Sequence, residues 1–233
     1  DGLMAHNIDP RLLRCEVGLT PLGEWMNFRA YFPERFNHQP RDGKSLGLRL
    51  ECFNSVDGSS KLMILLSWVR FICSNGMIIS DTLAVLKDIH DEHLDLTVIP
   101  EIIFEGLTKV SGDLDRLRGW EDFAVELPKF EDWADGELSK EWGKKAACRV
   151  IHICRSGADV ELTDPFASGK ASEKPVKPHG PVPGAPKPAK NLYDVCQALS
   201  WLATKRNSAE ERLQWQTQIP RLIENLRIRL RAA

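Results

Sequence analysis

The sequence lacks the short motifs that would mark an enzyme or a nucleotide-binding protein. Neither GxxxxGK[ST] nor GxGxxG occurs, so no phosphate-cradling loop of the common kinds is indicated. The six cysteines, at positions 15, 52, 73, 148, 154 and 196, form no CxxC pair and show no metal-type spacing to histidine. We therefore expect no catalytic site, no cofactor and no metal centre, and we expect reduced thiols in a cytoplasmic protein.

Long apolar runs are missing as well. The longest candidate covers residues 62–72, is interrupted by Arg70, and falls short of the roughly 20 residues that a membrane helix needs. No signal-like stretch opens the sequence. A chain of 233 residues can bury a sizeable core, so these features predict a globular protein with no membrane partner.

A strong net charge is also absent, because the formal charge is only −2. The charges are nevertheless unevenly distributed. Residues 120–137 are acidic and contain a single basic residue, Lys129, whereas residues 139–155 are basic and contain a single acidic residue, Glu141. The last fifteen residues add four arginines. The overall charge argues neither for nor against a nucleic-acid partner. The local basic segments are compatible with such a partner.

The N-terminal half shows the pattern of an antiparallel sheet. Alternating or β-prone residues predict strands over residues 24–32, 47–53 and 61–73. Turn chemistry separates them, with Asp57-Gly58 between the second and third strands and Asn75-Gly76 after the third. Asp-Gly and Asn-Gly tolerate positive φ and are strong hairpin signals.

Helical spacing follows the strands. Apolar residues predict helices over 81–94, 100–118, 139–154, 192–205 and 209–230. Ser208 with Glu211 three residues later forms a capping-box pattern at the start of the last helix. Pro220 should kink or split that helix. The predicted fold class is therefore α+β: an antiparallel β-meander packed against helices, with a C-terminal helical pair.

A Pro/Lys/Gly-rich tract divides the sequence. Residues 163–190 lack the apolar residues needed for a core and predict an extended, flexible loop. The expected organisation is an α+β core domain over residues 1–162, this loop, and a C-terminal helical unit over residues 191–233 that packs on the core.

Three blocks of the sequence resemble a known family. They are residues 54–60 (NSVDGSS), 69–77 (VRFICSNGM) and 191–200 (NLYDVCQALS), and with the sequence between them they span roughly residues 45–205. The chain resembles the domain-of-unknown-function 932 family, a phage/plasmid-like group. The resemblance implies a mobile genetic element and marks a signature loop with Asn54, Asp57, Gly58, Asn75 and Gly76. Val56 stands where the family commonly has histidine, so no role for that histidine carries over.

Two histidine clusters have alternative interpretations. His90 and His93 share a helical face in the predicted 81–94 helix, but no third ligand stands nearby, so a polar helix end is favoured over a metal site. His152 lies four residues from Cys148, as a nucleophilic pair would require. Nothing in the sequence supplies an orienting carboxylate, so partly buried structural residues are favoured.

The loop at 54–60 and the arginines of the strands also have two interpretations. Asn54 and Asp57 are explained by a hairpin turn as well as by a ligand loop. Arg70 inside an apolar strand must reach solvent, pair with a carboxylate or meet a phosphate. It could share an outer face with Arg49 and Trp68 and bind a nucleic-acid strand, or it could pair with Glu51 across the strands.

These observations lead to two hypotheses of different classes. The first is a non-enzymatic single-stranded DNA-binding or annealing protein of phage or plasmid origin, acting in recombination as a homo-oligomer, similar in outline to phage single-strand annealing proteins. Its expected contacts are Arg49, Arg70, Trp68, Lys144, Lys145 and Arg149. The second is a protein-interaction module of a mobile element that modulates a host defence complex, with the acidic 120–137 stretch facing a host or phage protein partner.

Overall fold

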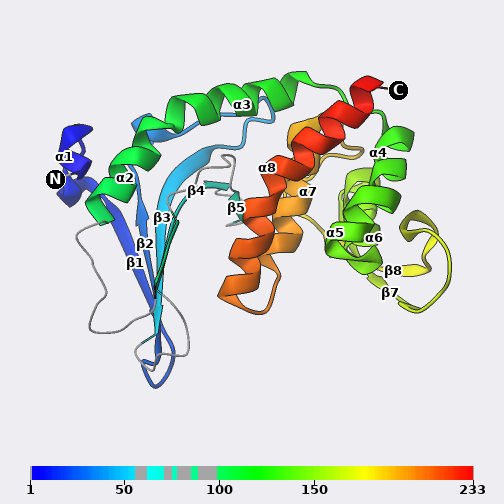
Figure 1. The fold of residues 1–233 in the computed structure, drawn as a ribbon, viewed down its shortest axis with the longest axis horizontal. Helices are drawn as coiled ribbons and strands as arrows, with labels where there is room; N and C mark the ends of the chain where they lie inside the picture. Colours follow the sequence, from blue (N-terminus) through cyan, green and yellow to red (C-terminus); the bar gives the residue numbers. More distant parts are fainter. Residues whose placement is uncertain (1, 56–61, 71–74, 78–84, 89–98, 233) are drawn as a thin grey trace. The chain divides into compact units, whose positions relative to one another are not determined.

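The computed structural model describes residues 2–55, 62–70, 75–77, 85–88 and 99–232. These residues form two compact units, Asp1–Asp115 and Arg116–Ala233, and each is described here by itself. Helix α3 crosses from the first unit into the second. The predicted α+β class is confirmed: strands dominate the first unit and helices the second (Figure 1).

The first unit is an antiparallel sheet with short helices at its start and end. Its order along the chain is α1 (Gly2–Ala5), η1 (Pro10–Leu12), β1 (Arg14–Leu19), β2 (Trp25–Tyr31), η2 (Glu34–Phe36), β3 (Leu46–Ser55), β4 (Leu62–Arg70), β5 (Asn75–Met77), β6 (Val85–Asp88), α2 (Ile99–Thr108) and the first half of α3 (Val110–Asp122). Strands β1 to β4 form the predicted meander, and β5 and β6 both pair with β4.

The two faces of the sheet differ in chemistry. Side chains alternate along a strand, and the register brings Leu48 opposite Trp68 and Leu50 opposite Leu66 on one face. Trp68 is buried there and its indole donates to Asp113 of α3 at 3.4 Å, so the start of α3 contacts this apolar face. The opposite face carries polar side chains from the same strands, among them Arg29, Arg49 and Glu51. The core of the unit draws on both faces, because Met63, Leu65 and Val69 of β4 are buried on the side of Arg49 and Glu51.

Two expectations for the first unit need correction. Residues 14–19 were not predicted to be a strand, yet they form β1 along the whole length of β2. The predicted helix over 81–94 is wrong in the part that the structure describes, because Val85–Asp88 is a strand that pairs with Leu62–Leu65 of β4. The four residues Val85, Leu86, Lys87 and Asp88 are too few to show a helical or a strand period, and the long-range pairing decides between the two structures.

The second unit is helical, with one two-stranded sheet. It continues from α3 through α4 (Leu127–Trp133), the π-helix η4 (Ala134–Leu138), α5 (Ser139–Trp142), α6 (Lys144–Ser156), β7 (Ala158–Leu162), η5 (Ala171–Glu173), β8 (Val176–Pro181), α7 (Leu192–Thr204) and α8 (Ala209–Ala232). The C-terminal helical pair α7 and α8 is as predicted, and Ser208 caps α8 by accepting from the Glu211 N–H at 3.0 Å. Pro220 lies inside α8, which continues as one helix.

Glycines set the ends of α6. Gly143 has φ +83° and separates α5 from α6, so the predicted 139–154 helix is interrupted once. Gly157 adopts the left-handed conformation with φ +68°, and its N–H donates to the Ile153 carbonyl at 2.8 Å. A residue with a Cβ would be strained at either position, so glycine fixes where α6 begins and ends.

Three buried tryptophans attach the other helices to α8. The indole N–H groups of Trp142 and Trp133 donate to Gln218 and Asn225, each at 2.7 Å. The indole of Trp120 lies 3.5 Å from Glu224 Oε1. Each ring thus fills the core while its single donor reaches a polar side chain of α8, which is how buried tryptophan is usually satisfied.

The Pro/Lys-rich tract is folded, which corrects the flexible-loop prediction for residues 163–190. Strand β8 lies within it and pairs with β7, and Ala189 N–H donates to the Cys154 carbonyl at 2.8 Å. Pro178 and Pro181 are tolerated because β8 pairs only with β7 in the described structure. The expected boundaries at residues 162 and 190 are likewise replaced by one division between Asp115 and Arg116.

Candidate nucleic-acid interface

Two of the expected binding residues of the sheet, Arg49 and Trp68, are buried. Arg49 is 5% exposed and Trp68 is 1% exposed. The ladder pairs Arg49 with Ser67 and Arg70 with Leu46, so the two arginine positions belong to opposite faces of the sheet. Arg49 and Trp68 cannot offer a shared outer surface to a nucleic-acid strand, and this part of the predicted site is wrong.

A carboxylate accounts for the buried arginine. Arg49 Nη2 donates to Glu51 Oε2 at 2.7 Å, and Glu51 Oε1 also accepts from Arg29 at 2.8 Å and from Asn27 at 3.1 Å. Burial by itself opposes the charged form of Glu51, but Arg49, together with Arg29 and Asn27, outweighs it and lowers the pKa of Glu51. The predicted pairing of Glu51 with Arg70 is replaced by pairing with Arg49 and Arg29, since Glu51 stands opposite Leu65 in the ladder.

The signature loop is only partly described. Asn54 is a half-buried residue of β3, while Asp57 and Gly58 lie outside the described residues. Asn75 and Gly76 were predicted to form a turn, but they are strand residues of β5, paired with Arg70 and Val69. The Asn-Gly pair therefore belongs to the strand ladder.

The basic residues predicted on α6 differ in their exposure and their partners. Lys144 and Lys145 are exposed in its first turn, where Lys144 Nζ donates to the Gly169 carbonyl at 2.9 Å. Arg149 instead forms two parallel bonds to Asp159, from Nε at 2.8 Å and from Nη2 at 2.5 Å. Arg149 is thus held as a structural ion pair, which corrects its expected role as a phosphate contact.

Asp159 joins three elements of the second unit. It is buried in β7 and accepts from Arg149 of α6 and from the Trp201 indole of α7 at 3.0 Å. Burial raises the energy of its charged form, yet the hydrogen bonds from Arg149 and Trp201 outweigh this and lower the pKa of Asp159. This carboxylate fixes the N-terminal half of α6 beside the C-terminal end of α7.

A stacked column that sequence reasoning missed lies at the same end of the unit. The rings of Trp142 and Trp215 stack with centroids 4.3 Å apart and planes inclined by 22°. The guanidinium of Arg206 lies over the Trp215 ring, with its carbon 4.3 Å from the centroid. The side chain of Arg206 is 36% exposed, so the column ends in a guanidinium plane that solvent reaches.

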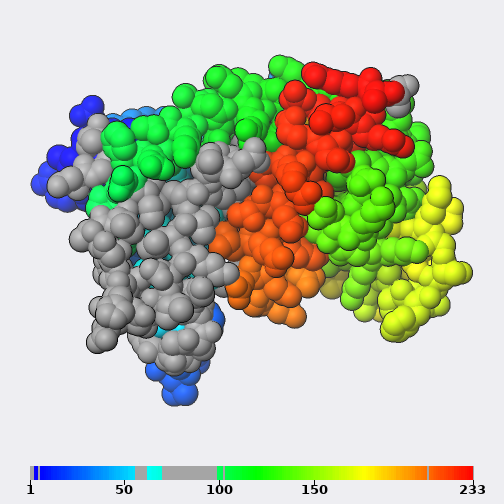
Figure 2. All heavy atoms as spheres, in the orientation of Figure 1, coloured from blue at the N-terminus to red at the C-terminus, as the bar shows by residue number. Residues whose placement is uncertain are grey.

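A second cation on an aromatic ring stands beside the column. Lys205 Nζ lies 4.3 Å from the centroid of Trp201, and Lys205 itself is exposed. We call the surface formed by these groups the tryptophan end. Its members are Lys144, Lys145, Trp201, Lys205, Arg206 and Trp215, and the buried Trp142 stacks on Trp215. Figure 2 shows atoms of the α7–α8 turn at the surface beside those of α5 and α6.

The electrostatics of the tryptophan end favour an anion. The first turn of α6 contains two lysines and no acidic residue, although the positive end of a helix dipole favours carboxylates there. Gly143 provides no side-chain cap, so the amide donors of this turn add to the positive charge. Glu211 offsets part of it, since its Oε2 lies 3.5 Å from Arg206 Nε. The two lysines therefore interact unfavourably with the helix dipole and concentrate positive charge in the first turn of α6.

Comparison with known proteins identifies no relative. No family model, curated protein or solved structure matches the chain. The resemblance to the domain-of-unknown-function 932 family therefore stays a prediction. Within the described part of the chain, no helix is both long and apolar enough to cross a membrane.

Among the described side chains, neither the alternative metal site nor the alternative nucleophilic pair Cys148–His152 is supported. His90 and His93 lie outside the described residues, and the described part of the chain has no group of three or more potential metal ligands. Burial raises the pKa of the Cys148 thiol to about 11, while burial, with Arg155, lowers the pKa of His152. A nucleophilic cysteine needs the opposite, a thiolate stabilised near neutral pH.

The acidic stretch over 120–137 is engaged within its own unit. Glu131 forms a two-point ion pair with Arg155 at 2.6 and 2.8 Å, and Asp135 accepts from the backbone and hydroxyl of Ser172. Further contacts join Glu126 to Lys129, Asp132 to Lys170 and Glu137 to Lys140. Glu131 and Asp135 thus join α4 and η4 to α6 and to the folded tract, and Asp132 adds a contact to the tract, whereas Glu126 and Glu137 pair with lysines three residues away.

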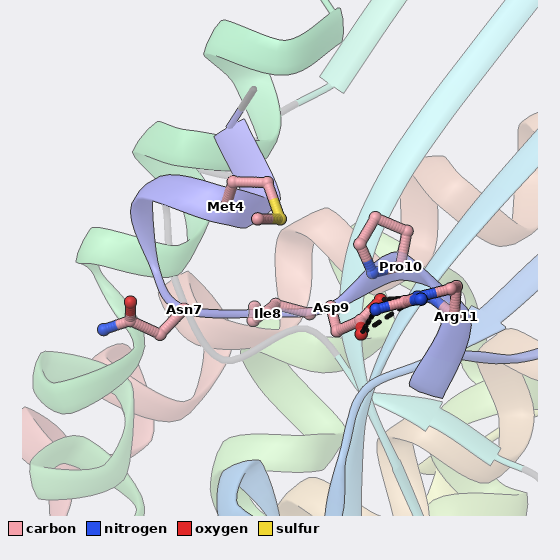
Figure 3. A pocket seen from close by; sticks show the side chains of 6 residues that line it. All are labelled: Met4, Asn7, Ile8, Asp9, Pro10 and Arg11. Atoms are coloured by element: carbon pink, nitrogen blue, oxygen red, sulfur yellow. Dashed lines mark hydrogen bonds and ion pairs between the residues drawn. The ribbon is translucent and has the colours of Figure 1, made fainter.

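A hollow in the first unit has modest chemistry. It has a volume of about 590 Å³ and is lined by Met4, Asn7, Ile8, Asp9, Pro10 and Arg11 (Figure 3). Its two charged side chains neutralise each other, because Arg11 donates to both carboxylate oxygens of Asp9, from Nε to Oδ1 at 3.0 Å and from Nη2 to Oδ2 at 2.7 Å. With its charges already paired, the hollow has no group poised for catalysis or for a charged ligand.

Proposed function

We propose that the protein binds single-stranded nucleic acid, without catalysing a reaction, through the tryptophan end of its second unit, and that it promotes annealing as an oligomer. The observation that carries the proposal is the column Trp142–Trp215–Arg206, which ends in an accessible guanidinium plane next to exposed lysines. The proposal keeps the predicted partner and the predicted Lys144 and Lys145. It replaces the sheet residues and Arg149 with residues of α7, of the α7–α8 turn and of α8.

The stacking geometry suits an unpaired base. Unstacked bases are bound on aromatic rings or on arginine guanidinium planes. Trp215 already has Trp142 against its ring at 4.3 Å and Arg206 over it at 4.3 Å, so a base would extend the column by stacking on Arg206. A duplex keeps its bases stacked on one another, so this mode of binding selects single strands.

The lysines supply the electrostatic part. Lys144 and Lys145 lie in the first turn of α6, two and three residues after Trp142, and Lys205 is the C-cap residue of α7, next to Arg206. Each phosphate that a protein neutralises on a single strand changes the slope of log K against log salt by about −0.7. Affinity should therefore fall as salt rises, with no preference for a particular base sequence.

Fluorescence anisotropy with a labelled oligothymidine tests the proposal. We expect the full chain to bind at low salt and to bind more weakly at high salt, and the Lys144→Ala/Lys145→Ala variant to lose affinity and to show a shallower salt slope. Arg229→Ala is the matched control, because Arg229 is an exposed cation in the last turn of the same unit's α8. No binding at low salt, or equal losses in both variants, would contradict the proposal.

A further inference from the structure

Strand β1 forms one edge of the sheet that the structure describes. In the described sheet it pairs with β2 alone and ends the strand order β1-β2-β3-β4-β5. Val17 is 60% exposed and Leu19 is 66% exposed, and Cys15 is exposed as well. An edge strand of this kind presents unpaired backbone groups to any strand that can align with it.

The hydrogen-bond pattern shows which backbone groups point outward. Thr20 N–H donates to the Trp25 carbonyl at 3.1 Å, which fixes the phase of the β1–β2 ladder. Directly opposed residues in an antiparallel pair alternate between bonded and non-bonded positions. Gly18 and Glu16 are therefore bonded to β2, whereas the N–H and C=O groups of Cys15, Val17 and Leu19 face away from it.

The same three residues carry the exposed apolar side chains. Cys15, Val17 and Leu19 share one face of β1, continuous with Phe28 and Met26 of β2. Natural edge strands are usually protected by proline, a bulge or an inward-pointing charge. β1 has no proline and pairs with β2 without a register shift, and its charged residues, Arg14 and Glu16, lie on the other face and pair with each other. The edge is thus open both in its backbone and in its apolar side chains.

We propose that a second copy of this chain occupies this edge, with the two β1 strands antiparallel and related by a two-fold axis at Val17. Val17 then lies opposite Val17 of the second copy, and Cys15 lies opposite Leu19. Each outward backbone group of these residues meets a partner, and the exposed apolar side chains cover one another. An isologous contact of this kind is self-complementary by symmetry and closes at two chains.

The alternatives for the register are less favourable. Centring the axis on Glu16 places Glu16 opposite Glu16, and like charges directly opposite each other are destabilising. Centring it on Cys15 requires the N–H of Leu13, which already donates to the Pro10 carbonyl at 3.2 Å. Centring it on Gly18 leaves Cys15 without a partner and shortens the ladder. With Val17 at the centre, Glu16 faces Gly18, which has no side chain to oppose it.

The mass of the protein in solution tests the contact without nucleic acid, so it is independent of the proposed function. We expect the full chain to show twice the single-chain mass of 26.3 kDa, and the Val17→Lys variant to show the single-chain mass. Leu22→Lys is the matched control, because Leu22 is an 87% exposed leucine in the β1–β2 turn, outside the ladder. A wild-type chain that stays single at all concentrations, or a Leu22→Lys chain that dissociates equally, would overturn the proposal.

Engineered cysteines test the register. In a chain with Cys15 and Cys73 changed to serine, Val17→Cys places two thiols on residues about 5.5 Å apart at Cα, within disulfide range. Gly18→Cys places them about 8 Å apart, beyond that range. Position 18 tolerates a side chain, because a Cβ added to Gly18 would come no closer than 3.9 Å to the Asn27 carbonyl oxygen. We expect rapid crosslinking of Val17→Cys only; equal rates at both positions, or none at Val17→Cys, would refute the register.

Discussion

The guanidinium carbon of Arg206 lies 4.3 Å from the ring centroid of Trp215, and Trp215 is itself stacked on Trp142. The three residues come from the α7–α8 turn, from α8 and from α5, so the fold of the second unit assembles the column. Arg206 is therefore held in place before any ligand arrives. A group that is pre-organised in this way binds with a smaller loss of conformational entropy.

Replacing Arg206 should separate stacking from charge. Arg206→Lys keeps the positive charge and loses the planar group, so we expect weaker binding to oligothymidine with an unchanged salt slope. Arg206→Ala loses both, and its salt slope should also become shallower by about 0.7 if Arg206 contacts one phosphate. Anisotropy titrations over a series of salt concentrations measure both quantities. Equal affinity of the wild type and Arg206→Lys would show that the guanidinium plane has no role.

Asp159 should make the stability of the second unit depend on pH. Its pKa in the folded protein is lower than the unfolded value of about 3.9, so its contribution is present above that value and is lost as the pH falls through the folded pKa. Asp159→Asn should cost about 1–3 kcal/mol at pH 7, because Arg149 loses its carboxylate. Urea unfolding followed by tryptophan fluorescence between pH 7 and pH 3 measures this.

The control for Asp159 is the exposed Glu161 on the same strand. Glu161 pairs with Lys177 at 3.1 Å on the surface, and Glu161→Gln should change the unfolding free energy by less than about 0.5 kcal/mol. A fall in stability on acidification that is identical in wild type and Asp159→Asn would exclude Asp159 as its source.

The link between Trp133 and Asn225 should contribute to the packing of α4 on α8. Asn225→Ala removes the acceptor at 2.7 Å from the buried indole, and we expect a loss of about 1 kcal/mol in the free energy of unfolding. Gln214→Ala, at an exposed position of the same helix, serves as the comparison and should have little effect. Chemical denaturation of the two variants decides the matter, and equal midpoints would rule out a net contribution from this bond.

The cysteines should differ sharply in reactivity. Burial raises the pKa of Cys148 to about 11 and that of Cys196 to about 12, and it raises the pKa of Cys154 as well. Cys15 is exposed on β1. At pH 8 we expect iodoacetamide to modify Cys15 in the native protein and to modify these three only after unfolding, as read by mass spectrometry of peptides. Native modification of Cys148 would contradict the packing of α6.

Local signals predicted much of this fold, and the failures share one physical cause. The Ser208 cap was read correctly because the hydrogen bond to Glu211 joins neighbours in sequence. The strand at Val85–Asp88 was read as helix, and the strand at Val176–Pro181 as loop, because pairing with β4 and β7 decides each of them. In so short a segment, the sequence shows no hydrophobic period that would reveal pairing with a distant strand.

The candidate site shows the same division. A basic run on a predicted helix is visible in the sequence, so the exposed, helical positions of Lys144 and Lys145 could be predicted from it. Arg49 was misjudged because Glu51, two positions along the same strand, shares its face and neutralises it. Trp215 stacks on Trp142, which lies 73 positions earlier in the sequence. Only the fold brings these two rings together. The Lys205-Arg206 pair between Trp201 and Trp215 was the one available signal.

Photo-crosslinking of a 5-iodouracil oligonucleotide to the full chain, with the attached peptide identified by mass spectrometry, tests the central proposal most directly. Binding at the tryptophan end predicts adducts in the segment from Trp201 to Trp215, and their loss in the Arg206→Ala variant. Adducts confined to the strands of the first unit, or binding without any adduct between Trp201 and Trp215, would contradict it.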